Sequence, residues 1–161
     1  MFAESRLEKM GLVLPAQLKP PGGVELPFPW IRVQGNRALI SGHGPQNPDG
    51  TLAGPFGKVG AEVSVEEAKH SALLVGLSIL GSLKRELGDL DRVESWLKIL
   101  GMVNSAPDFR DHPSVINGFT ELILEVYGKE RGRHARSAVG MAQLPFDIPV
   151  ETEGEVVIRE R

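Results

Sequence analysis

Hydrophobic positions in the middle of the chain repeat at the spacing of an α-helix. Ser64 and Glu67 have the spacing of a capping box, and Gly88 follows the last apolar residue, so the sequence predicts a helix between Ser64 and Gly88. At about 100° per residue, one face of this helix carries an apolar stripe. The stripe consists of Ala72, Gly76, Ile79, Leu83 and Leu87.

Further leucines widen the apolar surface of this helix beyond the stripe. Leu73, Leu74 and Leu77 lie to its side. A helix that is apolar over most of its circumference is buried deeply in a core or contacts another subunit. We favour deep burial and keep the subunit contact as the alternative.

A second helix is expected to begin near Pro113 and to end at Gly128. Asn117 points away from its core stripe and is therefore free for another role. The predicted core face consists of Val115, Phe119, Leu122 and Val126, flanked by Ile116 and Ile123.

Strand patterns surround the two helices. Residues 31–34 and 37–41 read as two short strands joined by a turn at Gly35-Asn36, and a long strand is expected over residues 92–104. The segments "HARSAVGMAQ" and "VETEGEVVIRE" close the chain as strands. This order predicts an α+β fold with a mixed β-sheet and two helices on one face. We expect one domain over residues 1–161, with an extended, Pro- and Gly-rich arm at about 1–30.

Composition narrows the possible classes of protein. The chain has 161 residues, a formal net charge of −3 and no cysteine. The absence of cysteine excludes disulfides, thiolate metal sites and a cysteine nucleophile, and favours a cytoplasmic location. The acidic balance gives no general attraction to nucleic acid, and no apolar run reaches the roughly 18–20 residues of a membrane span. We therefore expect neither a nucleic-acid nor a membrane partner.

The sequence gives no support for a metal or nucleotide site. The four histidines, His43, His70, His112 and His134, show no metal-binding spacing. The glycine-rich loops lack the complete dinucleotide or phosphate-loop patterns. The basic segment "GKERGRHAR" is interpreted as a solvated loop after a helix, with RNA contact as the less favoured alternative because no aromatic run accompanies it.

One strand combines a permanent cation with very small neighbours. Alternation places Arg136, Ala138, Gly140 and Ala142 on the same face. A guanidinium is planar and bidentate toward carboxylate, so such a niche suits a small carboxylate ligand. The alternative is a structural arginine whose salt bridge joins strands or subunits, with small residues that admit a helix. Spacing alone slightly favours this alternative.

Glu151, Glu153 and Glu155 share a face of the last strand by the same alternation. A carboxylate close to Arg136 could orient a water molecule, although a solvated face is the commoner case. In a simple hairpin, Arg136 would lie roughly 20 Å from Glu151 at about 3.3 Å per residue. The two residues can share a site only if the strands are not hairpin partners or if the site spans two subunits.

Four segments together resemble one protein family. "ALISGHGP", "SVINGFTELILEVYG", "HARSAVGMAQLP" and "VETEGEVVI" are similar, in this order, to the RidA/YjgF family of reactive-intermediate deaminases. The likeness runs from about Val33 to Ile158. The amino-acid sequence of these segments is most similar to a divergent bacterial branch of the family.

The resemblance implies a chorismate-mutase-like fold and a homotrimer with sites in clefts between subunits. By motif match, Arg136 would hold the carboxylate of a 2-imino or 2-enamino acid, and Glu151 would position the hydrolytic water. Gly42 would form part of the cleft wall, with Asn117 also in the site. No metal or cofactor is implied.

The sequence departs from the family pattern at two positions. Ala138 stands where many members have cysteine, and Phe28 or Trp30 occupies the region where an aromatic hydroxyl is expected. Two hypotheses therefore remain open. The first is a hydrolytic deaminase of small 2-imino or 2-enamino acids. The second is a non-catalytic, regulatory trimer that binds a small carboxylate metabolite. RNA processing is a third, disfavoured by the acidic charge balance.

Overall fold

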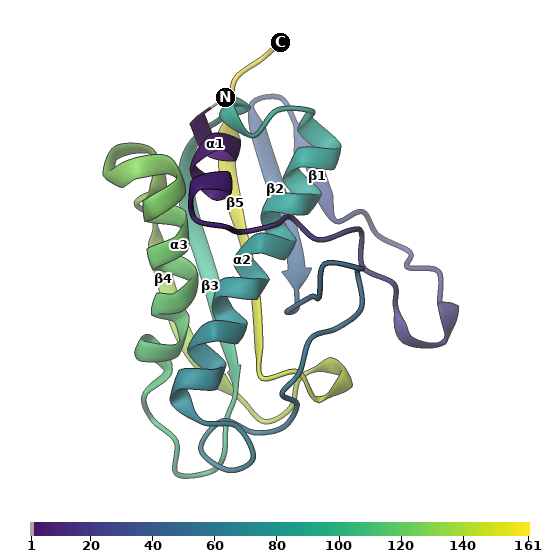
Figure 1. Ribbon diagram of the computed structural model, residues 1–161, viewed down its shortest axis with the longest axis vertical. Helices are drawn as coiled ribbons and strands as arrows, with labels where there is room; N and C mark the ends of the chain where they lie inside the picture. Colours follow the sequence, from purple (N-terminus) through teal and green to yellow (C-terminus); the bar gives the residue numbers. More distant parts are fainter. Residues whose placement is uncertain (1) are drawn as a thin grey trace.

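The computed structural model describes residues 2–161 as one layer of helices on one face of a mixed five-stranded sheet (Figure 1). The predicted α+β, chorismate-mutase-like single-domain class is confirmed. The helices are α1 (Phe2–Lys9), α2 (Val65–Leu87) and α3 (His112–Gly132). The strands are β1 (Ile31–Gln34), β2 (Arg37–His43), β3 (Val93–Asn104), β4 (Ala135–Met141) and β5 (Val150–Ile158). Short 3-10 turns occur at Pro21–Gly23, Leu90–Arg92 and Pro145–Asp147.

The order of strands in the sheet is β1-β2-β5-β3-β4. The strand β5 is antiparallel to both β2 and β3, whereas β4 runs parallel to β3. Parallel neighbours need a crossover connection, and α3 supplies it. Because β3 lies between β4 and β5, the last two strands are not hairpin partners.

Local signals fix the ends of α2 as predicted. Ser64 accepts a hydrogen bond from the Glu67 amide, and the Glu67 carboxylate accepts one from the Ser64 amide, which completes the capping box. Gly88 ends the helix with φ of 82°, a left-handed conformation that glycine adopts without steric cost. All five residues of the predicted stripe are buried.

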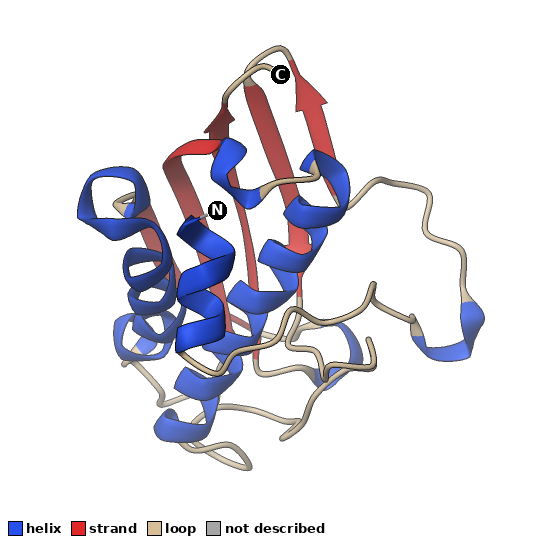
Figure 2. Cartoon of the chain, turned by 45° about the horizontal axis from the view of Figure 1, so that its top comes forward, coloured by secondary structure: helices blue, strands red, loops and turns tan. Residues whose placement is uncertain are grey.

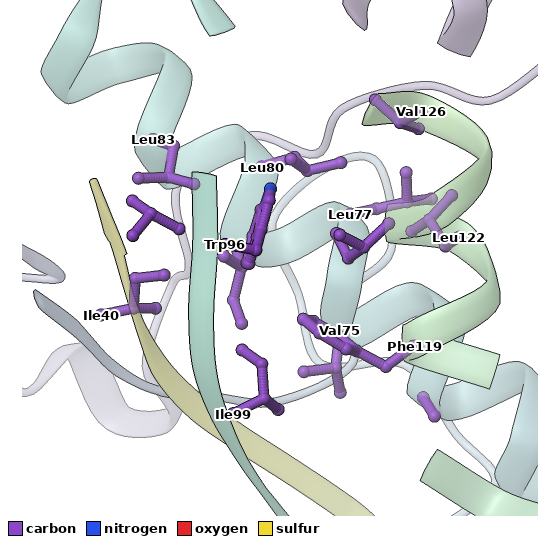
Figure 3. Packing of buried hydrophobic residues seen from close by; sticks show 14 of the residues in the cluster. Ile40, Val75, Leu77, Leu80, Leu83, Trp96, Ile99, Phe119, Leu122 and Val126 are labelled. Atoms are coloured by element: carbon purple, nitrogen blue, oxygen red, sulfur yellow. The ribbon is translucent and has the colours of Figure 1, made fainter. Parts of the chain in front are cut away.

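The core lies between the helices and the sheet. Trp96 reaches from β3 toward Leu77 and Leu80 of α2, and Phe119 of α3 packs against its ring (Figure 3). The predicted core face of α3 is buried in full. At Gly128 the helix is interrupted, as φ of 79° and ψ of 167° show, but a further turn continues to Gly132.

The wide apolar surface of α2 is covered by the chain's own N-terminal segment. Leu7 belongs to the core, and Leu12 and Leu14 pack against it. Lys84 Nζ lies 2.6 Å from Glu4 Oε1, and Arg85 Nη1 donates to the Pro15 carbonyl at 3.1 Å. The stripe and Leu77 are therefore buried within the described residues, whereas Leu73 and Leu74 are only partly buried, and the alternative of a subunit contact stays a prediction.

The expectation of an extended arm at residues 1–30 is wrong for its first part, because Phe2–Lys9 form α1. The N-terminal amides of Phe2 and Ala3 donate to the carboxylate of Asp91, at 2.6 and 3.1 Å. This distant cap stabilises a helix that is too short to be stable alone. The chain beyond it is extended and swings out past β1 (Figure 1).

Within the part of the chain that the structure describes, no helix covers the other face of the sheet (Figures 1 and 2). Leu39 of β2 and Val139 of β4 lie on this uncovered face, 43% and 37% exposed. The glutamates of β5 share it, as predicted. None of the helices within residues 2–161 is long and apolar enough to cross a bilayer.

Candidate functional site

Arg136 lies on the helix-facing side of the edge strand β4. It pairs with Ile99 of β3, whose side chain is buried in the core. Its guanidinium donates from Nη1 to Thr120 Oγ1 at 2.9 Å and from Nη2 to the Pro113 carbonyl at 3.2 Å. Within the described residues, these partners are neutral oxygens of α3 and not carboxylates. Between residues 2 and 161, Arg136 therefore forms no salt bridge that joins strands, whereas a salt bridge to another subunit stays a prediction.

The Thr120 hydroxyl, which accepts a hydrogen bond from Arg136, is held in place by further hydrogen bonds. His134 Nδ1 lies 2.8 Å from the Gly132 carbonyl, and its Nε2 lies 3.0 Å from Thr120 Oγ1. The Nδ1–H donates to the carbonyl, so Nε2 accepts from the Thr120 hydroxyl, which accepts in turn from Arg136. Burial is the main cause that lowers the pKa of His134, and the Arg136 charge lowers it further. The neutral imidazole is therefore favoured beside this cation.

Asn117 belongs to the same side of α3 as the two partners of Arg136. Pro113, Asn117 and Thr120 follow one another at helical spacing, so their side chains share a face. Ala138, two residues along β4 from Arg136, packs partly buried against the core. Helical spacing therefore places Asn117 between the two α3 partners of Arg136, and Ala138 lies on the same face of β4 as Arg136.

The small residues beside Arg136 are explained by the close approach of α3. A Cβ at Gly140 would lie 2.5 Å from His112 Nε2, and one at Gly101, opposite Ala138, would lie 2.6 Å from Ile116. Small residues admit the helix, as the structural alternative proposed, and the helix then supplies oxygens to Arg136.

Glu151 and Gly42 lie together on the uncovered face of the sheet. The neighbours of Glu151 on β5, Val150 and Thr152, are fully buried on the helix side. A Cβ at Gly42 would lie 2.2 Å from Glu151 Oε2, so only glycine leaves the carboxylate in this position. Burial raises the pKa of Glu151, and the neighbouring charge of Glu153 raises it further.

An apolar pocket of about 370 Å³ opens beside Gly42 and Glu151. The N-terminal segment up to Trp30, the end of β2 with the loop that follows it, and the segment that leads into β5 form its walls. Its larger side chains are Leu26, Phe28, Trp30, Leu52, Phe146 and Ile148. Behind Trp30, His43 is buried between the Ser41 carbonyl and Ser82, and burial lowers its pKa to about 4.

The candidate residues thus form two separate groups in one chain. Arg136 lies at the level of Ile99 and Glu151 at the level of Met102, with β3 between their strands. Two strand spacings of about 4.8 Å and three residues of about 3.3 Å place the two backbones roughly 14 Å apart. Their side chains also leave opposite faces of the sheet. We call Arg136, Asn117 and Ala138 the arginine half-site, and Gly42 with Glu151 the glutamate half-site.

Comparison with known proteins identifies the family of this chain. The model of the family described as "YjgF/chorismate_mutase-like, putative endoribonuclease" matches residues 4–149. The chain belongs to the YjgF/RidA family.

Three similar proteins extend this result. Protein TCP17 of Trypanosoma cruzi is 38% identical over 152 residues, which cover 94% of this chain and 91% of that protein. The crystal structure of Atu1372 from Agrobacterium tumefaciens, a protein of unknown function, is 37% identical with a TM-score of 0.85, covering 98% of this chain and 92% of that one. A putative endoribonuclease from Shewanella oneidensis MR-1 is 26% identical with a TM-score of 0.87, covering 98% and 100%.

The structure also shows that no tyrosine takes the place of the aromatic hydroxyl expected in the YjgF/RidA family. Tyr127 is the chain's only tyrosine, and it is buried on α3 with its hydroxyl donating to the Leu90 carbonyl at 2.9 Å. It therefore cannot supply the expected phenol. Phe28 and Trp30 instead lie in the apolar pocket.

Sequence reasoning missed several features of the site. It did not identify Thr120 and His134 as partners of Arg136, although Thr120 lies at helical spacing from Asn117. It also missed the pocket of the N-terminal segment, for which an apolar run of Leu26, Phe28 and Trp30 was the available signal.

The interpretation of "GKERGRHAR" as a solvated loop after a helix is wrong in part, because residues 129–132 continue α3 and several of the basic side chains have partners. Arg131 Nη2 donates to the backbone carbonyls of Asp91 and Val93, and its guanidinium lies over the Tyr127 ring. His134 and Arg136 face α3, as described above. Within residues 2–161, no group of three or more histidine, aspartate or glutamate side chains is arranged to hold a metal ion.

Proposed function

We propose that this chain is a cofactor-free hydrolytic deaminase of 2-imino and 2-enamino acids. It acts as a homotrimer, in clefts where the arginine half-site of one subunit meets the glutamate half-site of the next. A cytoplasmic location, where such intermediates arise, belongs to the same proposal.

The position of Glu151 carries this proposal. A carboxylate with a raised pKa, beside a glycine that leaves room for it and at the edge of an apolar pocket, suits a general base. Arg136 complements it as a cation whose partners in the chain are neutral, so its charge is available to a carboxylate ligand.

The chemistry follows from these two groups. Arg136 binds the substrate carboxylate and orients the C=N bond. Glu151 removes a proton from a water molecule as its oxygen forms a bond to the imine carbon, and the π electrons move to nitrogen. Transfer of that proton from Glu151 to the nitrogen gives a carbinolamine, which carries a hydroxyl and an amino group on the same carbon. Glu151 then takes the hydroxyl proton and gives it to the amino nitrogen, so the C=O bond forms while the C–N bond breaks and the nitrogen leaves as ammonia. The products are a 2-oxo acid and ammonia.

The second candidate is a trimer that binds a small carboxylate metabolite without hydrolysing it. Ala138 in place of the common cysteine and the buried position of Tyr127 favour this function. Both candidates share the role of Arg136 and differ in whether Glu151 activates water.

Ammonia release from freshly generated 2-aminoacrylate separates the two candidates. The proposal predicts that the protein accelerates this release and that Glu151→Gln lowers the acceleration by about 10²–10⁴-fold. A wild-type protein that binds 2-oxobutyrate but leaves the rate of ammonia release unchanged would establish the binding function instead.

A further inference from the structure

The pocket beside Glu151 is larger than the smallest substrates of the proposed reaction require. Its volume is about 370 Å³. An apolar cavity of about 150 Å³ is enough to hold benzene, and ligand pockets of proteins span about 300–1,000 Å³. The side chain of 2-iminopropanoate is a single methyl group, which would leave most of this space unoccupied.

The chemistry of the walls is apolar. Leu26, Phe28 and Trp30 line one side, and Phe146 and Ile148 line another. Glu151 is the one ionisable side chain among the lining residues. A substrate whose imine carbon lies near Glu151 would therefore extend its side chain into surroundings without polar partners for it.

The segment that carries Phe146 is held in an unusual conformation. Phe146 has φ of 57° and ψ of 19°, a left-handed conformation that a bulky residue rarely adopts, and its side chain is 56% exposed. The next residue fixes the segment in place. The Asp147 carboxylate accepts from Asn104 Nδ2 at 3.1 Å, and its carbonyl accepts from the Gly57 amide at 2.8 Å.

A strained and solvent-exposed aromatic ring at the edge of a pocket has no evident benefit for the folded state alone. Such strain concentrates at sites where a side chain contacts a ligand. A ligand with an apolar ring would shield Phe146 and Phe28, which is 46% exposed, from water.

We propose that this pocket is a subsite for the side chain of the substrate and that it selects 2-imino acids with ring-sized apolar side chains over those with a methyl or ethyl group. The inference rests on the proposed function, because it places the reacting carbon beside Glu151. The selectivity comes from the N-terminal segment and from Phe146.

Binding of 2-oxo acids, the products of the reaction, tests the subsite. Calorimetry would compare pyruvate, 4-methyl-2-oxopentanoate and phenylpyruvate. We expect affinity to rise in this order, with phenylpyruvate bound about 10-fold or more tightly than pyruvate.

Phe146→Gly is the decisive variant, because it removes the ring and relieves the backbone strain together. It should weaken phenylpyruvate binding by about 10-fold, leave pyruvate binding unchanged and not lower the melting temperature. Phe56→Ala is the matched control, since Phe56 is 45% exposed but does not line the pocket. It should change neither affinity.

The outcomes distinguish the subsite from the proposed function. If phenylpyruvate and pyruvate bind equally well, and Arg136→Lys weakens both, the subsite proposal is refuted while the proposed function stands. Equal binding is also the result if a side chain of a second subunit fills the pocket. If none of the three acids binds, the proposed function fails and the subsite fails with it.

Discussion

Arg136 is a permanent cation on an edge strand, and its hydrogen bonds in the chain go to a threonine hydroxyl and a backbone carbonyl. A structural arginine normally has its charge balanced by a carboxylate. Here the guanidinium is oriented by α3 but keeps its charge available. This arrangement suits a group that binds an anionic ligand in the correct orientation.

Replacement of Arg136 by lysine separates charge from geometry. Lysine keeps the positive charge but cannot make the paired, planar contact of a guanidinium with carboxylate. We expect Arg136→Lys to fold normally and to bind 2-oxobutyrate about 10-fold more weakly, since a charge-assisted hydrogen bond contributes roughly 1.5–3 kcal/mol. Calorimetry measures the affinity and thermal melting controls for folding. Equal affinity in two equally folded proteins would contradict a carboxylate-binding role.

The raised pKa of Glu151 also affects the stability of the folded protein. Because folding raises this pKa above its ordinary value of 4.5, the folded state favours the protonated carboxyl group. The stability that the group contributes is therefore fully present below pH 4.5 and is lost as the pH rises through the raised value. The proposed mechanism requires ionised Glu151 at neutral pH, and this ionised state is maintained at the expense of stability.

Glu153→Gln tests the electrostatic part of this pKa. Removal of the neighbouring negative charge should lower the pKa of Glu151, so the acidic limb of the activity–pH profile should move to lower pH. Glu155→Gln is the control, because Glu155 is paired with Arg37 and is not a cause of the shift. An unchanged profile in Glu153→Gln, or an equal shift in both variants, would contradict this assignment.

At the scale of elements, α2 and α3 cross in very close contact, and this contact places the arginine half-site. A Cβ at Gly118 would lie 2.0 Å from the backbone carbonyl oxygen of Lys69. Glycine at this point lets α3 approach α2 closely. The position of Asn117, the preceding residue, depends on this approach.

Gly118→Ala should therefore destabilise the protein although alanine has the higher helix propensity. A backbone carbonyl cannot move aside as a flexible side chain can, so the helices must separate, at a cost of about 1–3 kcal/mol. Urea unfolding measures the change. Glu125→Ala, an exposed change on the same helix, should alter the free energy of unfolding by less than about 0.5 kcal/mol. A stabilised Gly118→Ala variant would contradict the close crossing.

The sequence predicts the elements whose signals are local. Ser64, Glu67 and Gly88 mark the ends of α2 directly, and Gly35-Asn36 marks the turn between β1 and β2, where Gly35 has φ of 61°. By contrast, α1 depends on a cap from Asp91. The Ala3 amide, which donates to the Asp91 carboxylate, lies 88 positions earlier in the chain. No local pattern contains that information.

The candidate site is predicted only in part, because only some of its features follow from local sequence patterns. Alternation identifies which residues share a face with Arg136 or Glu151, because this follows from strand geometry. The contact between Gly42 and Glu151 depends on β5 lying beside β2, and the sequence does not specify that order. The link from Arg136 to Thr120 likewise depends on how α3 packs over β4.

In the molecule as a whole, one face of the sheet carries exposed apolar side chains and one edge strand has an unpaired edge, and both features favour contact with a partner. Leu39 and Val139 are exposed on the uncovered face, and β4 has one unpaired edge. Exposed sheet edges are normally paired or covered in stable proteins. Arg136 lies on this edge strand and Glu151 on the uncovered face. A neighbouring subunit packed there would explain why one chain carries the two half-sites apart.

We propose that Arg136 and Glu151 act together across a subunit boundary, and mixed oligomers are the most direct test. Arg136→Ala and Glu151→Gln should each be nearly inactive as homotrimers, with a sedimentation mass of three 17.5 kDa chains. Co-expression of the two variants creates interfaces in which the intact arginine of one subunit meets the intact glutamate of another. We expect 2-aminoacrylate hydrolysis to return to about a quarter of the wild-type rate, because random assembly makes about three quarters of the trimers mixed and one of the three interfaces in each mixed trimer is intact. Mixed trimers as inactive as the separate variants would contradict a shared site.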